Sequence, residues 1–233
     1  MRLRNVKNAR EIVSNHPLII KENIFDNSKK LHIEIGCGKG SFIIEMAKRN
    51  PDINFIGIEK YESVLIRALE KIEDIPSNLR FMCFDAGNID AIFSKNVDTI
   101  YLNFSDPWPK TRHAKRRLTS PIFLDLYDKI SSGKTHIIMK TDNKGLFAYS
   151  LETLNNAGFH FNRVSLDFPL IESVPTEYEM KFRNSGETIN YLDAIKWFYN
   201  QFYKWYNYSR RKYEKNNIIN YFINISNWLC KYK

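Results

Sequence analysis

Cysteine is scarce in this sequence, and its few cysteines form no pattern. The 233 residues contain three of them, Cys37, Cys83 and Cys230, and no two are spaced as in Cys-x-x-Cys. The five histidines also stand at no spacing typical of metal ligands. We therefore expect neither a bound metal nor a disulfide framework, as is usual for proteins of the reducing cytoplasm.

Long apolar runs are missing as well. No stretch reaches the roughly 18 consecutive apolar residues that a membrane-spanning helix needs. The charged start, Met1-Arg2-Leu3-Arg4, is not followed by the apolar region of a signal peptide. These features predict a cytoplasmic protein without a membrane partner.

Acidic residues are fewer than basic ones. The sequence contains 26 Asp and Glu and 35 Lys and Arg, which gives a formal net charge of +9. A basic balance of this size favours a polyanionic partner such as a nucleic acid, but it does not identify that partner alone.

What the sequence does contain is an alternation of apolar strands and amphipathic helices. Strands are expected at residues 31–35, 53–58, 79–84, 97–104, 134–140, 159–166 and 188–195. Helices are expected at residues 41–50, with Ser41 as the cap, and at 61–72, 121–130 and 145–157. This order predicts an α/β fold with a parallel sheet and helices on both faces. Ligands of such sheets bind beyond the carboxyl ends of the strands.

We divide the chain into three segments. Residues 1–30 are a lead-in with a basic arm, residues 31–196 carry the α/β pattern, and residues 197–233 are an extension rich in aromatic and basic residues. Thirteen aromatic residues and a single acid, Glu214, lie in that extension. So many aromatic side chains are unfavourable in water, and we expect the extension to be at least partly ordered and packed.

A glycine-rich loop follows the first predicted strand. Gly36, Gly38 and Gly40 let the backbone adopt positive φ and approach a ligand closely, but a nicotinamide-dinucleotide fingerprint would need glycine in place of Ser41. Glu59 ends the second strand, where it could accept hydrogen bonds from a ribose diol. Asp85 follows the third strand, where it could lie near an adenine amino group. The alternative for both acids is that polar residues simply follow strands.

The most informative stretch is Asn103-Phe104-Ser105-Asp106-Pro107-Trp108-Pro109. It places an amide, a hydroxyl, a carboxylate and an aromatic ring in one corner, a set that can hydrogen-bond to a base and stack on it. Five of the next eight residues, 110–117, are Lys or Arg, which suits phosphate binding. The alternatives are an ordinary Asp-Pro turn, a core tryptophan and a solvated basic face.

Downstream, Thr176-Glu177-Tyr178-Glu179 allows two interpretations. It could be only a helix start with Thr176 as the cap, or it could belong to a binding site.

These motifs together resemble one family, the bacterial tRNA (guanine-N7)-methyltransferases. The resemblance covers about residues 1–196, and chains of that family generally end near the position of Lys196. It rests on the stretches His32–Gly40, Ile56–Glu59, Tyr101–Lys110, Arg112–Leu118, Lys140–Asn143 and Thr176–Phe182.

The resemblance implies a Rossmann-like class I methyltransferase with a mostly parallel seven-stranded sheet, S-adenosylmethionine as the cofactor and the variable-loop guanine 46 of tRNA as the substrate. It implies that cofactor binding involves Glu34, Gly36, Gly38, Gly40, Glu59, Asp85 and Asp106, with Asp106 also catalytic. It implies substrate binding by Lys110, Asp142, Thr176, Glu177, Tyr178 and Glu179. It implies RNA contacts by Arg112, His113, Ala114, Lys115, Arg116 and Arg117.

Two other functions remain open from the sequence. One is a methyltransferase that acts on an exocyclic amine of a nucleic-acid base, and the other is a non-catalytic RNA-binding protein on a Rossmann scaffold. The sequence also leaves open whether the protein is a monomer or a homodimer.

Overall fold

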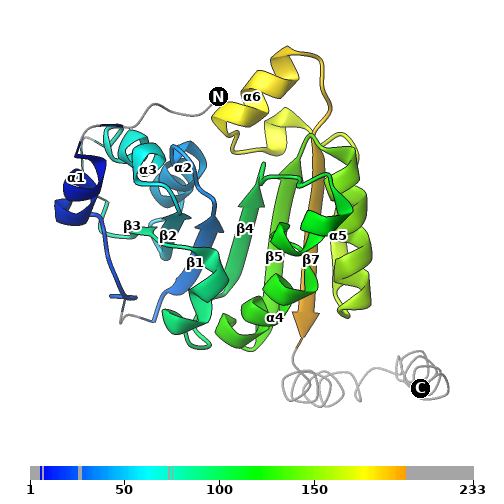
Figure 1. The fold of residues 1–233 in the computed structure, drawn as a ribbon, viewed down its shortest axis with the longest axis horizontal. Helices are drawn as coiled ribbons and strands as arrows, with labels where there is room; N and C mark the ends of the chain where they lie inside the picture. The colour runs from blue at the N-terminus through cyan, green and yellow to red at the C-terminus, as the bar shows by residue number, and fades with distance from the viewer. Residues whose placement is uncertain (1–5, 7, 26–27, 73, 75, 198–233) are drawn as a thin grey trace, which may run out of the picture. The chain divides into compact units, whose positions relative to one another are not determined.

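The computed structural model describes residues 6, 8–25, 28–72, 74 and 76–197, and strands alternate with helices along them (Figure 1). The strands are β1 Lys30–Ile35, β2 Ile53–Glu59, β3 Leu79–Cys83, β4 Thr99–Asn103, β5 Lys134–Thr141, β6 His160–Ser165 and β7 Asn190–Trp197. The α-helices are α1 Ala9–Asn15, α2 Ser41–Arg49, α3 Glu62–Leu69, α4 Pro121–Ile130, α5 Lys144–Asn156 and α6 Glu177–Asn184. Short 3-10 helices are η1 Ala86–Ala91, η2 Thr111–Arg116 and η3 Leu170–Glu172.

The strands form one seven-stranded sheet in the order β3-β2-β1-β4-β5-β7-β6. Pairs β1–β2, β1–β4, β2–β3 and β4–β5 are parallel, whereas β6 and β7 are antiparallel. Figure 1 shows β7 running against its neighbour β5. The sheet is therefore mixed but mostly parallel, as predicted, and the carboxyl ends of β1, β2, β4 and β5 meet at one edge.

Two apolar cores cover the two faces of the sheet, because successive strand residues point to opposite sides. On one face Ile33 and Ile35 of β1 pack with side chains of α4 and α5. On the other face Phe55 and Tyr101 pack with side chains of α1, α2 and α3. The prediction of helices on both faces is thus confirmed.

The lead-in before β1 is integrated into this architecture. Helix α1 packs on α3, and the backbone of residues 18–20 pairs with β3. The Phe81 N–H donates to the Leu18 carbonyl at 2.8 Å, and the Ile20 N–H donates to the Phe81 carbonyl at 2.9 Å. These bonds cover the outer edge of β3, which would otherwise expose unpaired backbone groups.

Some boundaries differ from the sequence-based expectations. Strand β4 begins at Thr99 rather than 97, and just before it the Asp98 side chain accepts a hydrogen bond from the Leu31 N–H at 2.9 Å. Helix α3 ends at Leu69 rather than 72. The expectation that Ser41 caps α2 was wrong, since the capping position is Gly40 with φ +71°, and Ser41 is the first helical residue.

Residues 1–196 form one compact unit. The predictions for the basic arm at Arg2 and Arg4, for Cys230 and for the order of the extension beyond Trp197 lie outside the described residues.

Candidate cofactor site and RNA-facing surface

A pocket lies beyond the carboxyl ends of β1 and β4. Its walls come from the glycine loop, the end of β4 and the N-terminal end of α6, which lie far apart in the sequence. The lining residues are Glu34, Gly36, Cys37, Gly38, Lys39, Gly40, Ser41, Phe42, Asn103, Phe104, Thr176, Glu177 and Tyr178.

The glycine loop needs its glycines for two physical reasons. Gly36 and Gly38 have φ +74° and +57°, which side-chain-bearing residues rarely adopt, and no heavy atom of the described residues lies within 4 Å of where a Cβ would be. At Gly40 a Cβ would lie 2.8 Å from the Cβ of Ala68, too close for any side chain. The loop therefore brings bare backbone to the pocket and packs α2 tightly on α3.

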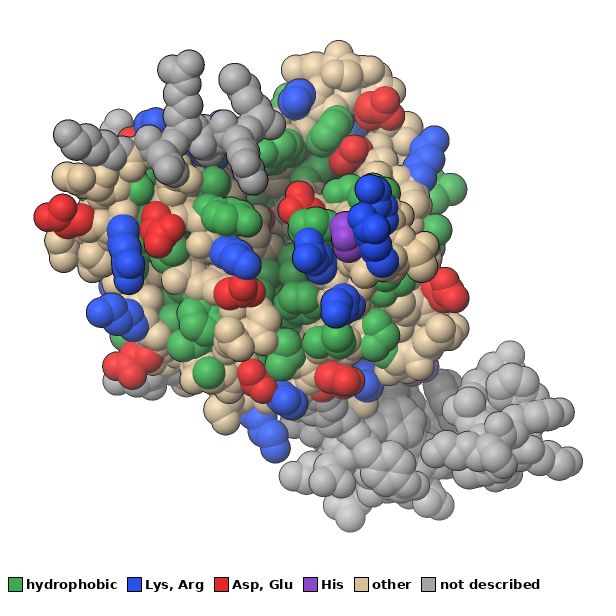
Figure 2. Space-filling model, viewed as in Figure 1, with side chains coloured by type: hydrophobic (Ala, Val, Ile, Leu, Met, Phe, Trp, Pro, Cys, Tyr) green, Lys and Arg blue, Asp and Glu red, His purple; other side chains and the backbone are tan. Residues whose placement is uncertain are grey.

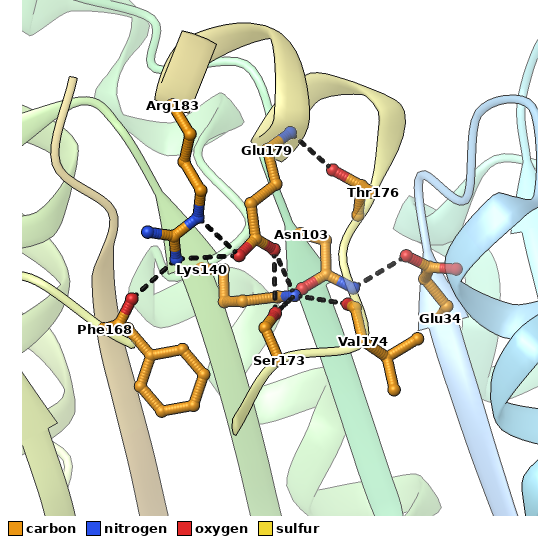
Figure 3. Close-up of polar contacts among 9 residues, drawn as sticks. All are labelled: Glu34, Asn103, Lys140, Phe168, Ser173, Val174, Thr176, Glu179 and Arg183. Carbon is orange, nitrogen blue, oxygen red and sulfur yellow. Dashed lines mark hydrogen bonds and ion pairs between the residues drawn. The ribbon is translucent and has the colours of Figure 1, made fainter. Parts of the chain in front are cut away.

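Glu34 and Asn103 form a buried polar pair under the pocket (Figure 3). Asn103 Nδ2 donates to Glu34 Oε1 at 2.8 Å, and the two residues are 6% and 2% exposed. Burial raises the pKa of Glu34 to about 8, while Asn103 and the nearby Lys140 cation act to lower it. Glu34 Oε2 and Asn103 Oδ1 have no hydrogen-bond partner among the described residues.

These two oxygens suit a ligand with N–H donors, such as an ammonium group, since buried acceptors without partners are costly. S-adenosylmethionine carries an ammonium group, so these two acceptor oxygens of the pocket fit it. Asn103 was predicted as part of the base-binding corner but not among the cofactor-binding residues. Its position at the end of β4, three residues before Asp106, is the signal that could have identified it.

Glu59 is held by backbone rather than by side chains. Its carboxylate accepts hydrogen bonds from the N–H groups of Gly38 at 3.1 Å, Lys60 at 2.8 Å and Tyr61 at 3.1 Å. Burial raises the pKa of Glu59, although these three donors oppose that shift. The side chain thereby ties the glycine loop to the end of β2 and keeps its carboxylate beside the pocket.

Asp85 lies one strand further along the same edge and is more open. Lys60 Nζ lies 2.7 Å from Asp85 Oδ2, and the Gly87 N–H donates to Asp85 Oδ1 at 3.0 Å. These contacts, led by the one to Lys60, lower the pKa of Asp85.

Asp106 lies in an irregular backbone corner after β4. Phe104 and Trp108, on either side of it, have φ +50° and +42°, an uncommon conformation for residues other than glycine. Such strain persists only where the surroundings hold it, and it concentrates at functional sites. Asp106 is exposed, and its charge contributes to the raised pKa of Glu59, so the two acids share one region.

The basic stretch 110–117 forms η2 directly after this corner. Arg112, Lys115 and Arg116 are exposed, and the Arg116 guanidinium lies over the Trp108 ring at 4.8 Å. His113 packs edge-on against the same ring at 5.8 Å. Figure 2 shows Lys and Arg side chains gathered with a histidine on the face in front of β5. This surface suits a phosphate backbone.

Lys110 and Asp142, two of the residues predicted to bind substrate, lie near the carboxyl-end edge of the sheet. Lys110 is exposed and precedes η2, whereas Asp142 follows β5 and lines a second cavity with Lys181 and Phe182. Burial raises the pKa of Asp142.

The segment 176–179 serves both interpretations offered by the sequence. Thr176 caps α6, because its hydroxyl accepts from the Glu179 N–H at 2.9 Å. Glu177 reaches back over the glycine loop to Lys39 and Lys71, which lower its pKa to about 2 against the opposing effect of burial. Tyr178 lines the pocket and is 56% exposed.

Glu179 differs from its neighbours, because its side chain is fully buried. Its carboxylate lies 2.6 Å from Lys140 Nζ and 2.9 Å from Arg183 Nη2 (Figure 3). Lys140 also donates to Ser173 Oγ at 2.9 Å and to the Val174 carbonyl at 2.8 Å. This arrangement anchors α6 and the preceding loop to β5.

Within residues 6, 8–25, 28–72, 74 and 76–197 there is no group of His, Cys, Asp and Glu side chains that could hold a metal ion. No helix among these residues is long and apolar enough to cross a membrane.

The sheet order, the glycine loop and the acids at the strand ends together define a class I S-adenosylmethionine-dependent methyltransferase fold. The solved 16S rRNA methyltransferase KamB has this fold, with a TM-score of 0.56 at 12% identity over 73% of this chain and 88% of that chain.

Sequence relationships are more specific. A family model described as "Putative methyltransferase" matches residues 28–192. A tRNA (guanine-N(7)-)-methyltransferase of Lysinibacillus sphaericus is 46% identical over 83% of this chain and 97% of that protein. One of Lachnoclostridium phytofermentans is 44% identical over 84% of this chain and 99% of that protein. The chain belongs to the tRNA (guanine-N7)-methyltransferase family, as the sequence motifs predicted.

Proposed function

We propose that this protein transfers the methyl group of S-adenosylmethionine to N7 of a guanine in tRNA, at position 46 of the variable loop. The observation that carries the proposal is the strained corner of Asp106, which follows the pocket residues Asn103 and Phe104 and leads in the sequence to the basic η2 surface. Membership of the family supports the same reaction.

The residues of the pocket would hold the cofactor through complementary polar groups. The buried oxygens of Glu34 and Asn103 suit its ammonium group, and the backbone of the glycine loop allows close approach. Glu59 and Asp85 are the acceptors proposed for the ribose hydroxyls and the adenine amino group. When bound, the cofactor supplies an electrophilic methyl group on a sulfonium sulfur.

The chemistry places a modest demand on the protein, because guanine N7 carries a lone pair and no proton. No general base is needed to deprotonate the nucleophile, and the main task is to align N7 with the methyl carbon. Alignment of this kind can contribute about 7–11 kcal/mol to lowering the barrier. Positive charge develops on the purine during transfer, and the Asp106 carboxylate would stabilise it electrostatically.

The surrounding residues divide into two proposed groups. Arg112, Lys115 and Arg116 would bind phosphates and so position the tRNA without reading its sequence. Lys110, Asp142 and Tyr178 are exposed or line cavities on the same side, where they would contact the substrate nucleotide. We propose that the protein acts in the cytoplasm, as a monomer or a homodimer.

The test is mass analysis of nucleosides from unmodified tRNA that has been incubated with the protein and S-adenosylmethionine. We expect 7-methylguanosine, which carries a fixed positive charge, and we expect strand scission at that base to map it to position 46. A methyl group on an exocyclic amine would favour the second methyltransferase function. Complete absence of cofactor binding by calorimetry would favour the non-catalytic RNA-binding protein.

A further inference from the structure

Arg117 ends the basic stretch 110–117, but its guanidinium is directed into the protein. Its Nε donates to the Pro107 carbonyl at 3.1 Å, and its Nη2 donates to the Trp108 carbonyl at 3.0 Å. The same guanidinium lies over the ring of Tyr149 in α5 at 4.2 Å. Arg117 is half-buried, whereas Lys115 and Arg116 are exposed.

The two carbonyls that Arg117 holds belong to the corner that carries Asp106. Trp108 there has φ +42°, a conformation that its own side chain disfavours. Two donors in the fixed geometry of one guanidinium can hold two successive carbonyls, while Tyr149 fixes the plane of the group from α5. A lysine ammonium lacks this planar fork and could not reproduce the arrangement.

The side chains of Arg112 and Arg116, in the same basic stretch, are not directed into the protein as that of Arg117 is. The Arg116 guanidinium lies over the Trp108 ring, and Arg112 makes its one described hydrogen bond to His113. Both keep their charges at the surface, where a phosphate can reach them. One basic stretch thus combines side chains that face solvent with one that braces the backbone.

We propose that Arg117 is a positioning residue that fixes the Pro107–Trp108 backbone and thereby Asp106, and that it is not a phosphate ligand of tRNA. This inference rests on the proposed function of the site. It separates Arg117 from the RNA-contact residues that the family resemblance implies for positions 112–117.

The experiment compares Arg117→Lys and Arg117→Met with Arg112→Met in the full-length protein. For each, tRNA affinity is measured across a salt series, and the single-turnover methylation rate is measured at saturating tRNA and cofactor. We expect both Arg117 variants to lose about 10²-fold in rate, as a displacement near 1 Å can cause, with the wild-type salt slope retained. Arg112→Met should instead reduce the slope by about 0.7–0.9, the effect of one lost phosphate contact.

Two further variants serve as a milder test of the same bracing contact and as a control for the loss of a surface charge. Tyr149→Leu removes the ring under the guanidinium but keeps both hydrogen bonds, so it should lower the rate in the same direction by a smaller factor, even if Arg117→Met folds poorly. Lys129→Met removes one exposed cation of α4 and should change neither quantity.

A reduced salt slope with an unchanged saturating rate in the Arg117 variants would overturn the proposal, and so would full activity of Arg117→Lys. If the wild-type protein methylated no tRNA, the proposed function itself would be wrong, and the role of Arg117 would fall with it.

Discussion

The ammonium group of Lys140 lies 2.6 Å from the carboxylate of Glu179, with side chains only 4% and 0% exposed. This pair joins the end of β5 to α6, and Arg183 completes it from the next turn of the helix. The family resemblance implied that Glu179 binds substrate. Because its carboxylate is buried and shared by two cations, we propose that Glu179 acts by holding α6 in place, so that Tyr178 faces the pocket.

The first prediction concerns the stability of this pair. Glu179→Gln leaves the buried Lys140 ammonium without its anionic partner, a change that typically costs about 3–5 kcal/mol of unfolding free energy. Urea denaturation monitored by circular dichroism measures it. The matched control is Glu172→Gln, which breaks the exposed ion pair with Arg163 and should leave stability nearly unchanged. Equal effects of the buried and the exposed changes would contradict the anchoring role.

The second prediction concerns pH and Glu34. The pKa of this buried carboxyl is raised to about 8 from its ordinary 4.5, so the folded state binds a proton more tightly than the unfolded state. Its contribution to stability is therefore complete below about pH 4.5 and is lost as pH rises towards 8. Glu34→Gln should flatten the decline in unfolding free energy between these pH values.

Cofactor binding tests the same group independently. An ammonium group beside Glu34 would favour the carboxylate form, so binding near pH 7 should release a proton, which calorimetry in buffers of different ionisation enthalpy detects. Glu34→Gln should abolish that release. A wild-type protein that binds the cofactor without proton release would place the ammonium group elsewhere.

The third prediction concerns catalysis by Asp106. Asp106→Asn keeps the shape of the side chain but removes its charge, and it should cost about 2–4 kcal/mol of transition-state stabilisation, as for other electrostatic catalytic groups. Single-turnover rates at saturating tRNA and cofactor report this loss. The affinity for tRNA should stay within a small factor of the wild-type value. A near-wild-type rate would remove Asp106 from the mechanism.

The fourth prediction concerns Glu59. Glu59→Ala should weaken S-adenosylmethionine binding by about 1.5–3 kcal/mol, the typical worth of a hydrogen bond to a charged group. Calorimetry measures the affinity. Glu59→Gln serves as the control, because it retains an acceptor for some of the three backbone N–H groups and should lose less. Unchanged affinity in both variants would move the ribose site away from Glu59.

The fifth prediction concerns the extension after β7. The described residues up to Trp197 contain the whole seven-stranded sheet and both apolar cores, so a protein truncated after Trp197 should still unfold cooperatively and bind the cofactor. Its tRNA affinity across a salt series tests whether the extension, with its excess of Lys and Arg, adds phosphate contacts. An identical slope would exclude that role, and a truncated protein that no longer folds would show that the extension belongs to the core.

Much of the fold followed from the sequence, because its strands and helices have strong local patterns. The glycine loop and the Asp106 corner were also visible, since each is a contiguous motif. The Lys140–Glu179 pair was not, because its members lie 39 residues apart and meet only through the topology. The sequence could not distinguish Arg117 from its basic neighbours. Its inward direction depends on where η2 ends and on the Tyr149 ring of α5.

The wall of the pocket has a consequence for the order in which the protein forms during synthesis. Lys39 in the glycine loop and Glu177 at the start of α6 are 138 residues apart, yet they lie in direct contact at the pocket. A ribosome that has completed β1 to β5 has made the acids of the strand ends but not the segment that faces them. The nascent chain can therefore build most of its parallel sheet before a cofactor pocket exists, and the pocket closes only when α6 emerges.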